Sequence, residues 1–304
     1  MSKPLADLRA ALGEGVQANA PLAPRTTFRI GGPADLLFEA RTIPELIEAV
    51  RLARQYGVPF FVLGNGSNIL VRDAGFRGLV IENHCTQFWL DVAEPGKATL
   101  HAESGASLPG IANRMARQGW CGLEWAIGVP GTIGGAIVGN AGAHGATIAD
   151  SLESVLILDL QGALQRLPKT DLAFDYRTSR FKREPGNVIL SAEFILTRDD
   201  PQMCITRMNE YTEHRRHTQP TEASIGSIFK NPPNDFAGRL IEQAGLKGTR
   251  IGNVQVSPVH ANFFVNRGGA TANEVLALIE LVRGRVREKF GIELELEIEI
   301  VGSG

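Results

Sequence analysis

Residues 128–145 read GVPGTIGGAIVGNAGAHG, and a second glycine-rich stretch, residues 64–68, reads GNGSN. The longer stretch holds seven glycines in 18 residues, so its backbone N–H groups can point at one place without interference from side chains. A pyrophosphate site has this requirement, but tight turns and close strand crossings also need glycine. Two such stretches in one chain, both with Asn, Ser or Thr among the glycines, favour a phosphate site.

Neither stretch is the fingerprint of a dinucleotide-binding Rossmann domain. Gly64-x-Gly66 lacks the third glycine of that motif, and the longer stretch begins with Gly-x-x-Gly spacing. The sequence therefore disfavours a Rossmann NAD domain.

The segments around the two stretches predict a mixed fold. Residues 42–57 are typical of a helix that starts with a Thr42/Glu45 capping box, and residues 60–63 form a short apolar strand that runs into GNGSN. A second helix is expected at residues 108–118, opened by Ser107, just before the longer stretch. Further strands are expected at residues 155–160, 164–167 and 188–196. Many strands with few helices indicate an α+β fold rather than a doubly wound sheet.

The last third of the chain predicts a separate C-terminal unit. Residues 201–219 are polar and helix-permissive, and we expect the boundary there. Helices are expected at residues 236–244 and 273–290. A final strand, residues 294–300, alternates apolar residues with glutamates, which places three carboxylates on one face: Glu295, Glu297 and Glu299.

Composition narrows the class of protein. A chain of 304 residues is long for one core, so two or three packed units are expected. The net charge of −2 gives no excess of positive charge that would bind nucleic acid or anionic lipid. No apolar run approaches the roughly 18 to 20 residues of a membrane span, and residues 1–15 fit a short amphipathic helix without an apolar signal core, which favours the cytoplasm.

The three cysteines offer no obvious pairing. Cys85, Cys121 and Cys204 are scattered, odd in number and outside any C-x-x-C spacing. We therefore expect buried free thiols rather than a disulfide or a zinc site, and no metal is expected.

An ordered set of motifs resembles the UDP-N-acetylenolpyruvoylglucosamine reductase family (UDP-N-acetylmuramate dehydrogenase), in its shorter form, over nearly the whole chain. The motifs are TFRIGG at 27–32, LGNGSNILV at 63–71, PGTIGG at 130–135, NAG at 140–142, YRTS at 176–179, GSIFKNP at 226–232 and LIEQAGLK at 240–247.

The resemblance implies a fold, a cofactor and a substrate. The expected fold is an FAD-binding domain of the vanillyl-alcohol oxidase (PCMH) type, with subdomains at residues 26–90 and 91–199, between an N-terminal helical segment at 1–25 and a substrate-binding domain at 200–304. It also implies non-covalent FAD, NADPH as reductant, a UDP-sugar enolpyruvyl ether as substrate, and a monomer. The enzyme would reduce the enolpyruvyl double bond in peptidoglycan precursor synthesis, with hydride from flavin N5 going to the terminal carbon.

Three residues match the catalytic positions of the family. Ser227 would donate a proton to the carbon that bears the carboxylate; outside its motif, a turn-stabilising serine would be the ordinary interpretation. Arg177 would hold the carboxylate and offset charge on the enolate, although Arg180, Lys182 and Arg183 lie close by. Glu297 would act beside the enolate, and only the family match selects it from the three glutamates.

The remaining site residues are assigned to the cofactor or the substrate. The expected FAD-binding residues are Gly64, Asn65, Gly66, Ser67, Asn68, Gly128, Pro130, Gly131, Thr132, Ile133, Gly135, Asn140, Ala141 and Gly142. The expected substrate-binding residues, each also open to a structural role, are Tyr176, Arg215, Lys230, Asn231 and His260. Two other functions stay open: a flavin oxidase of the same fold, which would use O₂, and an inactive flavin or UDP-sugar binding protein.

Overall fold

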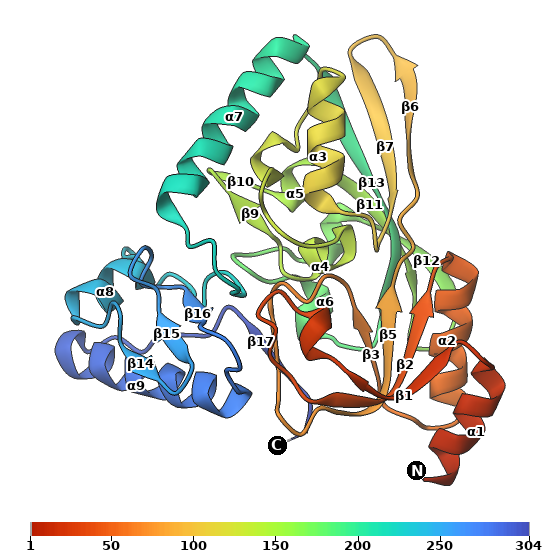
Figure 1. Cartoon of the computed structure of the whole chain (residues 1–304). Helices are drawn as coiled ribbons and strands as arrows, with labels where there is room; N and C mark the ends of the chain where they lie inside the picture. Colours follow the sequence, from red (N-terminus) through yellow and green to blue (C-terminus); the bar gives the residue numbers. More distant parts are fainter. Residues whose placement is uncertain (1, 304) are drawn as a thin grey trace.

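The computed structural model describes residues 2–303 and contains three units (Figure 1). The first is a four-stranded sheet in the order β1-β2-β5-β3, with strands at Val16–Pro21, Pro33–Ala40, Phe76–Asn83 and Phe60–Leu63. Two helices pack on it, α1 (Lys3–Leu12) and α2 (Ile43–Gln55), and α2 starts with the expected Thr42/Glu45 capping box.

The N-terminal segment is more than a helix. The expectation of a helical segment over residues 1–25 is wrong for its second half, because β1 pairs antiparallel with β2 and forms an edge of the first sheet. Val16 and Ala20 are buried in this strand. The sheet, and not local helix propensity, therefore determines the conformation of this part.

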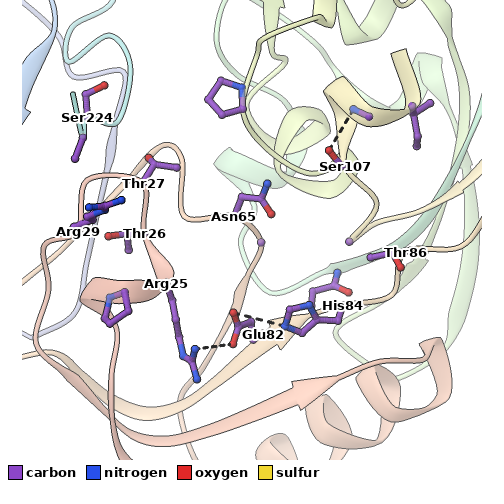
Figure 2. A pocket seen from close by; sticks show the side chains of 18 of the residues that line it. Arg25, Thr26, Thr27, Arg29, Asn65, Glu82, His84, Thr86, Ser107 and Ser224 are labelled. Carbon is purple, nitrogen blue, oxygen red and sulfur yellow. Dashed lines mark hydrogen bonds and ion pairs between the residues drawn. The ribbon is translucent and has the colours of Figure 1, made fainter. Parts of the chain in front are cut away.

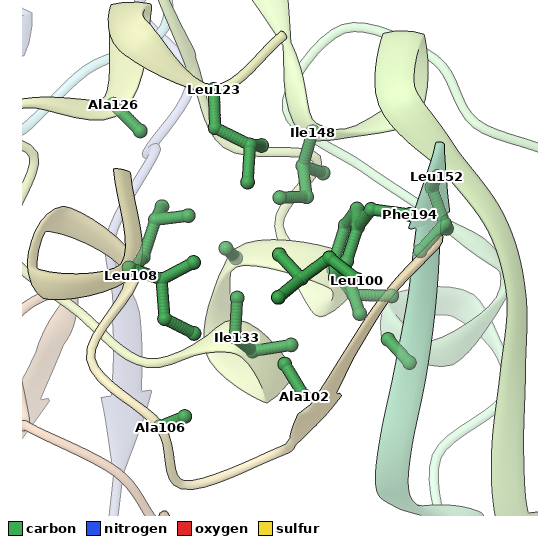
Figure 3. Packing of buried hydrophobic residues seen from close by; sticks show 14 of the residues in the cluster. Leu100, Ala102, Ala106, Leu108, Leu123, Ala126, Ile133, Ile148, Leu152 and Phe194 are labelled. Atoms are coloured by element: carbon green, nitrogen blue, oxygen red, sulfur yellow. The ribbon is translucent and has the colours of Figure 1, made fainter. Parts of the chain in front are cut away.

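The second unit is a six-stranded antiparallel sheet. Its main path is β12-β11-β13-β7-β6, with strands at Leu164–Pro168, Leu152–Leu158, Val188–Arg198, Lys97–Glu103 and Phe88–Glu94, and β8 (Trp120–Cys121) also pairs with β13. Short helices cover one face: α3 (Leu108–Arg117), α4 (Ile133–Val138) and α5 (Ile148–Ser151). Figure 3 shows side chains from these helices, among them Leu108, Ile133 and Ile148, packed against Leu100 and Phe194 of the sheet.

Helix α7 (Pro201–Thr218) lies along the second unit. It packs against α3, and a disulfide joins Cys204 of α7 to Cys121 of β8, with the two Cα atoms 6.4 Å apart. The expectation of free thiols is therefore wrong for these two cysteines and correct for the buried Cys85. Sequence spacing did not reveal the pair because the fold brings together positions 83 residues apart. We infer that the C-terminal domain begins after α7 and not before it.

The third unit has its own core. A three-stranded sheet, β14-β15-β16, is formed by Arg250–Ile251, Val254–Val256 and Phe264–Asn266. Helices α8 (Ala237–Gln243) and α9 (Ala272–Phe290) pack with it, and α9 buries its apolar stripe of Val275, Leu278, Ile279, Val282 and Val286. The remaining short elements are η1 (Ala23–Arg25), η2 (Glu124–Ala126), η3 (Lys169–Leu172), α6 (Arg180–Arg183), β9 (Gly142–Ala143) and β10 (Ala146–Thr147).

The end of the chain returns to the first unit. β17 (Glu299–Val301) pairs parallel with β4 (Ile69–Val71), so the expected strand at 294–300 is regular only at its end. Its earlier part bonds to the loop that contains Ser227: Glu297 N donates to Ile228 O, and Lys230 N donates to Glu295 O. The two parts of the segment have different partners, which interrupts the ladder. Among residues 2–303, no helix has both the length and the apolar character needed to cross a membrane.

Candidate active site

The structure brings the two glycine-rich stretches into contact. Ser67 Oγ donates to Pro130 O at 3.0 Å. A Cβ atom on Gly64 would lie 2.6 Å from Thr132 Oγ1, which is closer than real Cβ atoms approach. Glycine at this position is therefore required by the close approach of the two segments.

A cavity of about 1340 Å³ opens beside this contact (Figure 2). The first unit contributes Arg25, Thr26, Thr27, Arg29, Glu82 and His84; the second contributes Gly105, Ser107 and Arg114; both glycine-rich stretches contribute through Gly64, Asn65 and Pro130. Residues 221–224, just before the Ser227 loop, complete the wall. The cavity therefore lies where all three units meet.

The polar lining of the cavity fits a large anionic cofactor. Arg25 and Glu82 form an ion pair at 3.4 Å, but Arg25 Nε and Glu82 Oε2 are buried without a hydrogen bond. Buried polar atoms without partners are rare in folded proteins and are found where a ligand binds. Arg29 and Arg114 add positive charge to the same cavity. Its volume, its cations and its backbone donors fit a dinucleotide with a pyrophosphate.

Not every residue predicted to bind the cofactor lines this cavity. Gly66 has φ +58°, and a Cβ there would lie 2.6 Å from Arg25 O, so backbone packing explains this glycine. Asn140 Nδ2 donates to Asp175 O at 2.9 Å and supports the turn that carries Arg177. Asn68 Nδ2 donates to Glu297 O at 3.2 Å.

Other residues that were predicted to bind the cofactor have contacts that explain them structurally. Thr132 caps α4 by accepting a hydrogen bond from Gly135 N, and Ile133 is fully buried in the core. Gly142 starts the β9–β10 hairpin. Gly131 accepts a hydrogen bond from Leu108 N at 3.1 Å, and Gly128 lies against Arg215.

Sequence reasoning missed several cavity residues. Arg25, Glu82, His84 and Arg114 line the cavity but belong to none of the glycine-rich stretches. Thr27 and Arg29 could have been found from the sequence, because they belong to the TFRIGG motif. Arg25 lies in η1, Glu82 and His84 lie at the end of β5 and just after it, and Arg114 lies in α3. These residues become neighbours only in the folded chain.

Arg177 and Glu297 form the centre of a second polar cluster. Arg177 Nε lies 2.9 Å from Glu297 Oε1. Glu297 N donates to Ile228 O at 2.9 Å, so the residue that follows Ser227 is bonded directly to the glutamate. The fold thus gathers the turn at 175–178, the loop at 226–232 and the end of the chain.

The backbone of Arg177 is strained. Its φ of +53° lies in the left-handed region, which a non-glycine residue adopts at a cost. A hydrogen-bonded turn holds this conformation, since Thr178 N donates to Asp175 O at 3.2 Å. The strain is typical of a side chain that is aimed at a fixed place.

The three glutamates have different surroundings. Burial raises the pKa of Glu297, although Arg177, Lys182 and Lys230 lower it, and its side chain is 16% exposed. Glu295 is 76% exposed and pairs with Lys230 at 3.3 Å. Glu299 is also exposed. Of the three, Glu297 is the one that pairs with Arg177.

The predicted substrate-binding residues lie in three places. Tyr176 and Asn231 are neighbours, because Asn231 N donates to Tyr176 Oη at 3.3 Å, and Lys230 is adjacent. Arg215 lies against Gly128 at the end of α7, where burial lowers its pKa. His260 Nδ1 accepts a hydrogen bond from Asn262 N at 3.2 Å, and burial lowers the pKa of this histidine too.

Comparison with known proteins agrees with this architecture. Residues 34–168 match the family model described as "FAD binding domain", and residues 219–301 match "UDP-N-acetylenolpyruvoylglucosamine reductase, C-terminal domain". These two domains define a flavoprotein oxidoreductase and confirm the predicted α+β fold of an FAD-binding domain followed by a C-terminal domain.

Full-length relatives identify the family. UDP-N-acetylenolpyruvoylglucosamine reductase of Rubrobacter xylanophilus is 48% identical over 93% of this chain and 94% of the relative, and that of Moorella thermoacetica is 43% identical over 98% and 97%. The crystal structure of the Thermus caldophilus reductase superposes with a TM-score of 0.78 at 36% identity, covering 94% of this chain and 97% of that one. The chain belongs to the UDP-N-acetylenolpyruvoylglucosamine reductase family.

Family membership decides between the functions that the sequence left open. The protein is a reductase of peptidoglycan precursor synthesis that uses FAD and NADPH. The oxidase and the inactive binding protein are set aside.

Proposed function

We propose that Arg177, Glu297 and Ser227 form the reaction centre in which this reductase converts the enolpyruvyl ether of UDP-N-acetylglucosamine to UDP-N-acetylmuramate. The observation that carries the proposal is the ion pair between Arg177 and Glu297 at 2.9 Å, joined to the Ser227 loop through Ile228. Each residue comes from a different part of the chain, and only the fold unites them.

FAD would be held without a covalent bond in the cavity between the units. Arg29 and Arg114 line this cavity, and their guanidinium groups, with backbone N–H groups of the glycine-rich stretches, would hold the pyrophosphate. Bound FAD supplies the hydride that reduces the enolpyruvyl terminal carbon, and NADPH restores the reduced flavin.

The chain's own residues control charge and protons. Ser227 donates its hydroxyl proton to the carbon that bears the carboxylate. Arg177 offsets the negative charge that develops there. Glu297, whose pKa is raised by burial, is an acid or hydrogen-bond partner beside the same carbon. A serine is a poor acid in water, so these neighbours must polarise its hydroxyl group.

The UDP part of the substrate lies toward Tyr176, Lys230 and Asn231. Tyr176 is 49% exposed, a high value for an aromatic side chain beside a polar cluster. Its ring can stack on a base, while Lys230 and Asn231 can bond phosphate or sugar oxygens. Arg215 and His260 are further candidates for the same ligand. We also propose that the protein acts as a monomer in the cytoplasm.

One anaerobic experiment tests the activity. The purified holoenzyme is bleached with NADPH, and the enolpyruvyl UDP-sugar is then added without oxygen. We expect the sugar to restore the oxidised flavin spectrum. Bleaching that only oxygen reverses would refute the reductase assignment.

A further inference from the structure

Three cations surround Glu297, and one of them has no carboxylate partner. Arg177 pairs with Glu297, and Lys230 pairs with Glu295 at 3.3 Å. The third is Lys182 of α6, whose Nζ donates to the main-chain oxygen of Glu297 at 3.4 Å. Among residues 2–303, no carboxylate oxygen lies within 4.0 Å of this ammonium group.

The surroundings of Lys182 are unfavourable for an ammonium group that has no carboxylate partner. The side chain is half-buried, and burial lowers its pKa. The charged groups that face it are Glu299, Lys230, Glu297 and Arg177. An ammonium group withdrawn from water is unfavourable unless an anion compensates it.

Helix α6 aims this lysine, and not its neighbours, at the reaction centre. Ser179 Oγ donates to Val138 O at 2.8 Å and Phe181 is buried in the core, which together fix the helix. Arg180 Nε donates to Glu184 Oε2 at 2.8 Å, and the Arg183 guanidinium group donates to Ala173 O. Of the three basic side chains of α6, only Lys182 contacts the segment that carries Glu297.

The substrate carries an anion that matches this position. We propose that Lys182 is a substrate-binding residue whose ammonium group holds the carboxylate of the enolpyruvyl group. This rests on the proposed function, in which the carboxylate is attached to the carbon that Ser227 protonates. Arg177, whose Nε forms an ion pair with Glu297, then shares the carboxylate with Lys182.

The test compares two ligands that differ only in the enolpyruvyl group. Oxidised holoenzyme without NADPH is titrated calorimetrically with the enolpyruvyl UDP-sugar and with UDP-N-acetylglucosamine. Lys182→Met should weaken binding of the first by roughly 10- to 100-fold, the effect of a lost charge-assisted hydrogen bond, and leave the second unchanged. Lys182→Arg should restore most of the affinity.

The matched control is Arg180→Met, which removes a charge from the same helix and should change neither affinity. If Lys182→Met does not retain the flavin spectrum, Lys182→Gln takes its place. If Lys182→Met weakened the binding of both ligands equally, or changed the affinity for neither, the proposal would be overturned. Failure of the wild-type protein to bind the enolpyruvyl sugar would instead refute the proposed function.

Discussion

Glu297 shows how one side chain can combine an acidic group with a buried position. Its carboxyl group lies beside Arg177 and near Lys182 and Lys230, yet burial has the larger effect and raises its pKa. A carboxyl group with a raised pKa retains its proton at a pH where ordinary glutamates have lost it. This property suits an acid or hydrogen-bond donor beside an enolate.

The raised pKa of Glu297 predicts a pH-dependent stability difference. Because the folded-state pKa lies above the unfolded value, this group stabilises the fold at low pH, and the contribution is lost as pH rises through the folded-state pKa. Glutamine cannot ionise. The Tm of Glu297→Gln relative to wild type should therefore increase from about pH 4 to about pH 7. A constant or decreasing difference, measured by thermal unfolding across this range, would show that the cations outweigh burial.

At the scale of single residues, sequence reasoning reached some conclusions and not others. Strand alternation placed Glu295, Glu297 and Glu299 on one face and could not separate them without the family match. The three glutamates differ in the folded protein because Arg177, on a turn far away in the sequence, pairs with Glu297. The unpaired charge of Lys182 likewise depends on neighbours that only the fold supplies.

At the scale of elements, helix α9 connects the C-terminal unit to the first unit. Asp73 accepts hydrogen bonds from Ala272 N at 2.7 Å and Asn273 N at 2.9 Å, at the start of the helix. The Thr271/Glu274 capping box satisfies other N–H groups of the same turn. The carboxylate of Asp73 also interacts favourably with the helix dipole.

Asp73→Ala should therefore destabilise the protein by about 1 kcal/mol, the usual cost of losing a helix cap. Asp7→Ala is the control, because Asp7 pairs with Lys3 on the surface of α1, where an exposed ion pair contributes little to stability. Denaturant unfolding measures both values. Equal losses in the two variants would mean that Asp73 acts as an ordinary surface charge.

The disulfide between α7 and β8 gives a second prediction at this scale. Native protein should show no thiol that reacts with Ellman's reagent, because Cys121 and Cys204 are joined and burial raises the pKa of the Cys85 thiol to about 12. Unfolding without reductant should expose one thiol. Reductant should lower the Tm of the wild-type protein, because loss of the disulfide costs about 2–4 kcal/mol of stability. It should leave the Tm of Cys204→Ser unchanged. Three reactive thiols in unreduced, unfolded protein would contradict the disulfide.

Local sequence patterns predicted the helices and their starts well. Features that depend on residues far apart in the sequence were predicted less well. The capping pair at Thr42 marked the start of α2, because a cap needs only residues three positions apart. The strand at 294–300 was predicted too long, since its two parts pair with Ile228–Lys230 and with β4. The disulfide was missed for the same reason.

At the scale of the whole molecule, the cavity that we propose for FAD lies between all three units (Figure 2). A ligand held there bridges the two sheets and the loop at 221–224. The ordered set of motifs predicted the FAD-binding fold and the C-terminal domain correctly. It did not predict the cations Arg25 and Arg114, which lie outside these motifs.

Asn65, which lines this cavity, gives the prediction for the cofactor. FAD at about 100 times its Kd should stabilise the wild-type apoprotein by about 2.7 kcal/mol. Asn65→Leu should leave the Tm of the apoprotein nearly unchanged and reduce the increase caused by FAD. Thermal unfolding with increasing FAD measures both values. The same increase in both proteins would place FAD elsewhere.

We propose that the cluster around Ser227 acts on the sugar and not on the flavin. Rapid anaerobic mixing can follow the two half-reactions of Ser227→Ala separately. We predict flavin reduction by NADPH at nearly the wild-type rate, and reoxidation by the enolpyruvyl UDP-sugar slowed by about 100-fold or more. Equal losses in both half-reactions would contradict the claim and show that Ser227 only shapes the site.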